Sequence, residues 1–297
     1  MRLFFTLLLL VLMPPTALAH EGGAIPADVW THWNTDPLML TALLLPLYLY
    51  LRGAATYPVA RWRTLAFTGG LAVLFVGLIS PLDVMGGTLF SGHMLQHLLF
   101  MLVAAPLLVS SRPLPSLLRG LPSAWRKTYG KLAHAPAVQK LWTKLARPVP
   151  IAALHIVVVW IWHIPGLYSV ALNQPIIHAL QHFTFFATAL LFWWMIFHTD
   201  HYVARILAVF AVMMTTGLLG ALMTFATTSW YDDHGTYASA WGLTVLEDQQ
   251  LGGLFMWIPP GIFYVLVAGV LLGGWLNTVE AKVRARERQL IKEMSDA

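Results

Sequence analysis

Seven runs of apolar residues dominate this chain, and they restrict its fold more than any other feature. They cover residues 37–51, 64–80, 89–109, 149–163, 175–197, 203–227 and 251–276. A membrane-spanning helix needs about 20 apolar residues, because the hydrocarbon core is about 30 Å thick and each residue adds about 1.5 Å. The first and fourth runs are short by this measure, and flanking residues are expected to extend them. Only 10% of the residues are charged, which also disfavours a soluble domain. We predict an all-α membrane protein with a bundle of seven transmembrane helices.

Positive charge is confined to alternate connections between these runs. Apart from Arg2, every Lys and Arg lies in residues 52–63, in residues 110–148, at Arg205 or in the tail 280–297. Cytoplasmic connections of membrane proteins carry such an excess of basic residues. The pattern therefore predicts that the N-terminus is outside and the C-terminus is cytoplasmic. Because the charge reflects topology, it gives no support for nucleic-acid binding.

The first residues have the pattern of a secretory signal peptide. Arg2 precedes a short apolar stretch, and Ala17 and Ala19 form a small-x-small cleavage site. We predict a cleaved signal peptide over residues 1–19, with an uncleaved anchor as the alternative. The transmembrane domain then covers residues 20–279, and a basic cytoplasmic tail covers residues 280–297.

The longest inner connection, residues 110–148, is a basic cytoplasmic loop with one amphipathic stretch. Val138, Leu141, Trp142 and Leu145 fall on one helical face beside two lysines. A basic amphipathic helix is typical of a segment that lies on anionic lipid. A docking surface for a protein partner is the alternative.

The pentad His-x-x-Gln-His occurs near the start of both the third and the fifth apolar runs. It comprises His93, Gln96 and His97 in one run, and His178, Gln181 and His182 in the other. The predicted topology makes these two helices parallel, so the four histidines lie at similar depth in the outer half of the membrane. Residues four apart share a helix face, so each pair can converge on one point. Polar groups inside membrane helices are costly and tend to be functional.

This pattern predicts a metal site with imidazole ligands. His163, at the outer end of the fourth run, is a possible fifth ligand, and His20 is a further one if the signal peptide is removed. The chain has no cysteine, so a metal must use imidazole, thioether, carboxylate or backbone ligands. Imidazoles without thiolates suit copper, zinc or haem iron, and thioether together with imidazole favours Cu(I). Gln96 and Gln181 either orient ligand rings or join helices.

The last outer connection adds further polar and small residues at the start of the seventh run. Asp248 can accept a hydrogen bond from a ligand histidine, or can simply favour the N-terminus of its own helix. Gly252 and Gly253 allow close helix approach. Met256 and Trp257 follow and are expected to support the site.

Five short motifs occur in order along the chain: "SPLD" at 80–83, "HMLQHLLFM" at 93–101, "WHIPGLY" at 162–168, "HALQHFTFF" at 178–186 and "DQQLGGLFMW" at 248–257. With them the chain resembles the polytopic, seven-helix CtaG family of bacterial cytochrome c oxidase assembly factors, and not the single-helix copper chaperone that shares the name. The resemblance implies a multi-pass protein of the bacterial inner membrane that handles copper for an oxidase. It also implies an oxidase subunit and a periplasmic copper donor as partners, and adds Asp83 as a supporting residue.

Our hypothesis is an assembly factor that passes copper to an oxidase subunit. It is not expected to be an enzyme, because ligand exchange needs no acid–base chemistry. Three alternatives remain: a bis-histidine haem protein that carries electrons, a copper permease and a metal-free assembly scaffold.

Overall fold

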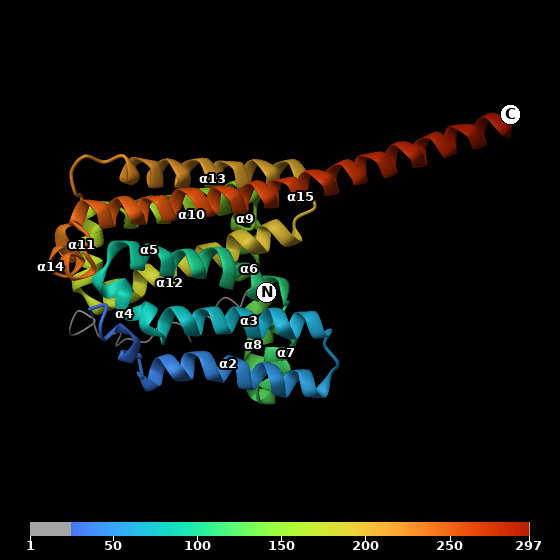
Figure 1. The fold of residues 1–297 in the computed structure, drawn as a ribbon. Coiled ribbons are helices and arrows are strands. Elements are labelled where there is room, and N and C mark those ends of the chain that lie inside the picture. Colours follow the sequence, from blue (N-terminus) through green and yellow to red (C-terminus); the bar gives the residue numbers. More distant parts are fainter. Residues whose placement is uncertain (1–24, 297) are drawn as a thin grey trace.

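The computed structural model describes residues 25–296, and the described part of the chain contains helices and turns but no strand (Figure 1). The predicted all-α class is therefore confirmed. The predicted signal peptide and His20 lie outside the described residues. Long helices run side by side and form a bundle, and the C-terminal helix projects well beyond it (Figure 1).

Among residues 25–296, five helices are long and apolar enough to cross a membrane, and the number reaches seven if two bent helix pairs each count as one span. The helices of the bundle are α2 (Pro37–Thr56), α3 (Arg61–Leu78), α5 (Phe90–Leu98) with α6 (Ala105–Ser110), α10 (Pro148–Trp162), α12 (Pro175–His198), α13 (Tyr202–Thr224) and α15 (Val245–Ser295). These agree with the seven predicted runs. A multi-pass membrane protein is thus supported, whereas the orientation of its termini stays a prediction.

The fourth predicted span is the weakest of the seven. Helix α10 has 15 residues, so it is about 22 Å long and shorter than the hydrocarbon core. The preceding helix does not lengthen it, because α9 (Pro136–Leu145) is bent from α10 by 81°. Pro148 and Pro150 follow this bend in the first turn of α10, and proline favours helix starts over helix interiors.

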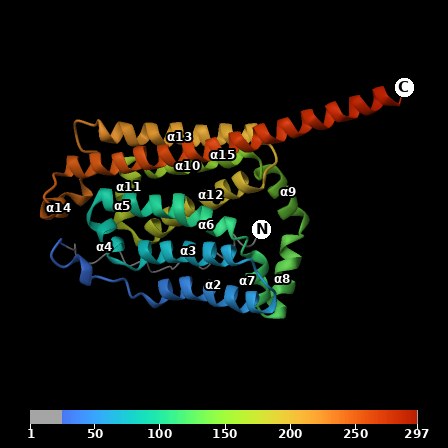
Figure 2. The same ribbon diagram turned by 45° about the vertical axis from the view of Figure 1, so that its right-hand side comes forward.

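The basic loop folds into three short helices, α7 (Leu114–Gly120), α8 (Ser123–Ala133) and α9. Helices α8 and α9 run across one end of the bundle (Figure 2). The amphipathic helix predicted there is present: Trp142 packs on Trp194 with ring centroids 4.9 Å apart, while Leu141 and Leu145 are exposed. The lipid contact predicted for this face stays a prediction.

A π-helical turn at Leu99–Ala104 joins α5 to α6. Within it, the amide of Ala105 donates to the carbonyl of Phe100 instead of that of Met101. The next residue is Pro106, which has no N–H, so the Met101 carbonyl loses both backbone donors. The indole N–H of Trp193 replaces them at 2.8 Å. This bond ties α5–α6 to α12, the two segments that carry the repeated pentad.

Helices α13 and α15 approach closely through glycine. A Cβ atom added at Gly220 would lie 2.7 Å from the carbonyl oxygen of Gly253, and one added at Gly253 would lie 2.7 Å from that of Gly220. A Cβ at Gly252 would lie 2.4 Å from the Phe90 ring. The predicted role of Gly252 and Gly253 in helix packing is thus confirmed.

The short helices α4 (Pro81–Thr88), α11 (Pro165–Asn173) and α14 (Gly235–Ala238) gather at the end of the bundle opposite the C-terminal tail (Figure 1). Both pentads begin at this end, since His93 and His178 lie in the first turns of α5 and α12.

Candidate metal centre

The two pentads bring four imidazoles together between α5 and α12. Ring centroids of His93 and His97 lie 4.3 Å apart, and those of His178 and His182 lie 4.5 Å apart. Across the helices, His97 lies 4.6 Å from His182, and His93 lies 5.4 Å from His178. The predicted convergence within each pair is present, and the two pairs face each other. We name these four residues the four-His cluster.

Ring nitrogens point into the middle of the cluster. The Nε2 atom of His182 is 2.9 Å from Nε2 of His178 and 3.4 Å from Nε2 of His97. One ligand nitrogen from each of His93, His178 and His182 lies within 4.8 Å of the others. Three nitrogen donors can therefore face a single ion without movement of a helix, and His97 lies next to them.

Nε2 of His93 and Nδ1 of His97 are buried and have no hydrogen-bond partner among residues 25–296. An unsatisfied buried polar atom costs about 1–3 kcal/mol, so such atoms call for an explanation. The other nitrogen of His93 contacts the Gly86 carbonyl at 3.3 Å, which places the proton on Nδ1 and leaves the Nε2 lone pair available to an ion.

Access to the cluster differs between its two helices. His93 and His97 are 1% and 3% exposed, whereas His178 and His182 are half-buried. The α12 side is therefore the more open one.

Aromatic side chains cover His93 at the end of the bundle. The Tyr168 ring meets the His93 ring edge-on at 5.5 Å, and its hydroxyl lies 2.8 Å from Nε2 of His234. Phe90 stacks on Tyr231 at 4.6 Å. Burial raises the pKa of Tyr231 and lowers the pKa of His234, so both side chains are neutral near pH 7.

The side chain of Asp248 forms hydrogen bonds with the start of α5, although the two are more than 150 positions apart in the sequence. Its buried carboxylate accepts from the backbone N–H of Phe90 at 2.7 Å, from that of Ser91 at 3.0 Å and from the Ser91 hydroxyl at 2.5 Å. The first N–H groups of a helix have no intrahelical acceptor, and a carboxylate there also favours the helix dipole. Asp248 therefore caps the helix that carries His93 and His97, and none of these three bonds goes to a histidine.

Gln96 and Asp83 join helices. The Gln96 amide donates to the Gly77 carbonyl at 2.5 Å and to the Asp83 carboxylate at 3.1 Å, and Asn34 donates to the same carboxylate at 2.9 Å. Of the two roles considered for Gln96, this geometry agrees with helix joining. Gln181 is buried on α12.

Of the remaining predicted residues, His163 and Met256 line one cavity together with His97. His163 follows α10 and points at Met94, with 3.4 Å between Nε2 and the sulfur. Met256 lines a cavity with His97, Met94 and His163. Trp257 packs on Phe225, with ring centroids 5.6 Å apart, in the α13–α15 contact.

Comparison with known proteins places this geometry in a family. The family model described as cytochrome c oxidase caa3 assembly factor matches residues 46–278, a range that contains both pentads. The chain belongs to this family of assembly factors. The resemblance inferred from the sequence motifs is thereby confirmed.

Two relatives of this assembly-factor chain are uncharacterized proteins of mycobacteria. One from Mycobacterium bovis is 26% identical over 88% of this chain and 42% of its own length. Another, from Mycobacterium leprae, is 25% identical over 87% of this chain and 41% of its own length. The chain thus spans less than half the length of these relatives. No solved structure matches it.

The sequence patterns did not indicate two contacts of the site, the Asp248 cap and the pairing of His163 with Met94. Both join residues far apart in the chain, and no periodicity connects them. One signal for the Asp248 cap was available. The residue at the start of α5 is Leu89, whose side chain makes no capping hydrogen bond, so this helix start needs an acceptor from elsewhere in the chain.

Proposed function

We propose that this assembly factor binds copper in the four-His cluster and hands it to a cytochrome c oxidase subunit during assembly. Copper is cargo in this proposal. The observation that carries it is the convergence of imidazole nitrogens from two helices, with His182 Nε2 at 2.9 and 3.4 Å from two others.

These distances resemble those around a metal ion. Two imidazole nitrogens that bind one ion at about 2.0 Å with tetrahedral angles lie about 3.3 Å apart. The group of potential ligands here consists of histidines without a carboxylate. Neutral donors in a low-dielectric setting favour an ion of low charge, because burial of uncompensated charge is costly. We therefore propose Cu(I) as the bound form.

Exchange with partners is proposed to occur at the α12 side, where His178 and His182 are half-buried. The charge pattern supports an orientation with this end of the bundle outside the bacterial inner membrane. In that orientation a periplasmic copper donor and an extracytoplasmic oxidase domain would reach it. Helix α9, at the opposite end, is proposed to lie on anionic lipid through its apolar face.

The bis-histidine haem alternative fits this geometry less well. Axial imidazoles bind haem iron from opposite faces of the macrocycle, so the porphyrin separates them. The ring contacts of 4.3–4.6 Å within the four-His cluster leave no space for a porphyrin between any of these pairs.

Elemental analysis of the detergent-purified protein tests the proposal. We expect about one copper per chain at the cluster after anaerobic Cu(I) loading, and loss of that copper in the double variant His97→Ala/His182→Ala. The matched control is His134→Ala/His201→Ala, which removes two exposed histidines and should keep the copper.

A cellular assay tests the delivery step. Cells that lack the gene should show reduced copper-dependent oxidase activity, restored by the wild-type protein and by the control variant but not by His97→Ala/His182→Ala. Iron with a Soret band in the purified protein would instead support haem. Unchanged copper in the double variant would contradict the copper assignment, and absence of any metal would support a scaffold.

A further inference from the structure

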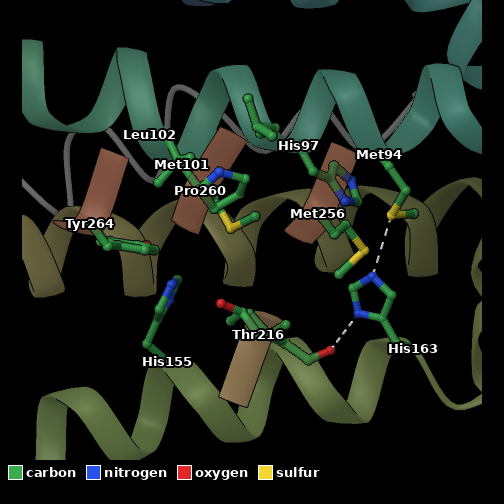
Figure 3. A pocket seen from close by; sticks show the side chains of 12 residues that line it. Met94, His97, Met101, Leu102, His155, His163, Thr216, Met256, Pro260 and Tyr264 are labelled. Atoms are coloured by element: carbon green, nitrogen blue, oxygen red, sulfur yellow. Dashed lines mark hydrogen bonds between the residues drawn. The ribbon is translucent and has the colours of Figure 1, made fainter. Parts of the chain in front are cut away.

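His97 of the four-His cluster also lines a small cavity. Its volume is about 40 Å³, and a space of about 10–15 Å³ already holds one water molecule. It is lined by three thioethers, three imidazoles and two hydroxyl-bearing side chains: Met94, Met101, Met256, His97, His155, His163, Thr216 and Tyr264 (Figure 3). Its lining residues include no Asp, Glu, Lys or Arg. The cavity thus combines soft sulfur donors with neutral nitrogen donors.

The protonation of His163 is determined by its two contacts. Its Nδ1 atom lies 2.6 Å from the backbone carbonyl oxygen of Val159. A carbonyl oxygen only accepts, so a bare nitrogen at this distance would be repelled, and Nδ1 must carry the proton. In a neutral ring the Nε2 atom then has a free lone pair.

That lone pair faces a second lone pair. Nε2 of His163 is 3.4 Å from the sulfur of Met94, and thioether sulfur carries no proton to donate. A doubly protonated ring would solve the mismatch, but no carboxylate lines this cavity to balance its charge. A cation bound by both the nitrogen and the sulfur would resolve the mismatch. Donation of the other ring N–H to a backbone carbonyl is also how metal-binding histidines are oriented.

Met256 supplies a further thioether. It belongs to α15, packs against the same apolar cluster as Met94 and points into the cavity next to the His163 ring (Figure 3). The three side chains therefore come from α5, from the end of α10 and from α15. Two thioethers and one imidazole suit Cu(I), whereas Zn²⁺ and Cu²⁺ prefer sites richer in nitrogen or oxygen.

We infer that Met94, His163 and Met256 form a second site for a soft monovalent ion, Cu(I), distinct from the four-His cluster. His97 borders both: its Nε2 atom faces His182, and the residue lines the cavity. Cu(I) can pass between the two sites by exchange of ligands at His97, with no change of oxidation state. The inference extends the proposed function, because it takes the ion to be copper, but its geometry does not depend on delivery to an oxidase.

X-ray absorption of the purified full-length protein tests this inference. The probe is Cu(I), added anaerobically to two equivalents per chain, with Ag(I) as a redox-inert check. We expect both sulfur and nitrogen scattering from bound copper in the wild type. In Met94→Leu/Met256→Leu the sulfur scattering should disappear and the bound copper should fall from about two to about one per chain. Leu has nearly the volume of Met, so this change is mild for packing.

Two further variants separate the sites. The matched control Met213→Leu/Met214→Leu removes two methionines of α13 that do not line the cavity and should keep the sulfur signal. His178→Ala/His182→Ala should lose the nitrogen-only copper and keep the sulfur-bound copper. If His178→Ala/His182→Ala keeps the sulfur-bound copper and cells with this variant still assemble the oxidase normally, the proposed delivery role of the four-His cluster is refuted. The second site is then still supported.

The inference is overturned if wild-type copper shows no sulfur scattering, or if Met94→Leu/Met256→Leu leaves that scattering unchanged. Loss of all copper in His178→Ala/His182→Ala would also overturn it, because one mixed site would then replace two.

Discussion

The Asp248 cap leads to a sharp prediction, since one buried carboxylate holds the helix that carries half of the four-His cluster. Replacing Asp248 with Asn keeps the size of the side chain but leaves only one oxygen acceptor. If that oxygen keeps the two bonds from Ser91, the amide NH₂ faces the N–H of Phe90, which loses its acceptor. A buried donor left unsatisfied costs about 1–3 kcal/mol, and a bond to a charged acceptor is worth about 1.5–3 kcal/mol. We therefore expect a loss of about 2–3 kcal/mol in unfolding free energy.

Asp248→Ala removes all three bonds and should cost more than Asp248→Asn. The assay is reversible unfolding of the detergent-solubilised protein, followed by tryptophan fluorescence. The matched control is Glu247→Gln, which removes the same charge one residue away. Glu247 is exposed and completes a capping box with Thr244, and Gln serves in that box as well, so the control should change stability by less than about 0.5 kcal/mol.

The copper content of Asp248→Asn provides a second readout. His93 and His97 lie in the first two turns after the capped residues, so fraying of this start should weaken copper retention although every ligand remains. If Asp248→Asn is as stable as Glu247→Gln, the cap is not a stabilising element and the reasoning is refuted.

Two other contacts give predictions on helix packing. Trp193→Phe removes the indole N–H that satisfies the Met101 carbonyl and should lower the unfolding free energy by about 1–3 kcal/mol. The control is Trp125→Phe, because Trp125 is exposed. A loss in Trp193→Phe no greater than that in the control would contradict the prediction. Gly220→Ala places a methyl group 2.7 Å from the Gly253 carbonyl oxygen. It should lower the unfolding free energy by about 1–3 kcal/mol, because α13 must move away from α15. The control is Gly261→Ala, where the methyl group enters open space and stability should stay the same or rise. Both are measured by the same unfolding assay.

The part of the site that sequence could predict depends on helical periodicity. A spacing of four residues places His93 above His97 and His178 above His182 in any α-helix, and the charge pattern made the two helices parallel. These two local facts were enough to predict one shared depth and a converging cluster. They did not determine which faces of α5 and α12 oppose each other, because that rotation is set by contacts such as Trp193 with Met101.

Contacts at helix ends could not be predicted in the same way. The π-helical turn depends on where the Met101 carbonyl finds a donor, and the Asp248 cap depends on how α15 packs against α5. The fourth span shows the same difficulty, since hydropathy gave its apolar length but not the 81° bend before it. In each case a backbone group without a local partner is satisfied by a residue distant in the sequence.

His163 shows most clearly why the end of a helix matters for the chemistry. The repeated pentads suggest that it is a fifth ligand of one site, because it lies at the same end of the bundle. In the fold, α10 ends at Trp162 and His163 takes a non-helical backbone conformation, with φ −95° and ψ 4°. This turn directs Nδ1 back to the Val159 carbonyl and Nε2 toward Met94. A ring that continued the helix would follow the 3.6-residue repeat of α10 instead. The choice between one five-histidine site and the two sites proposed above thus depends on the backbone of His163, the first residue after the helix.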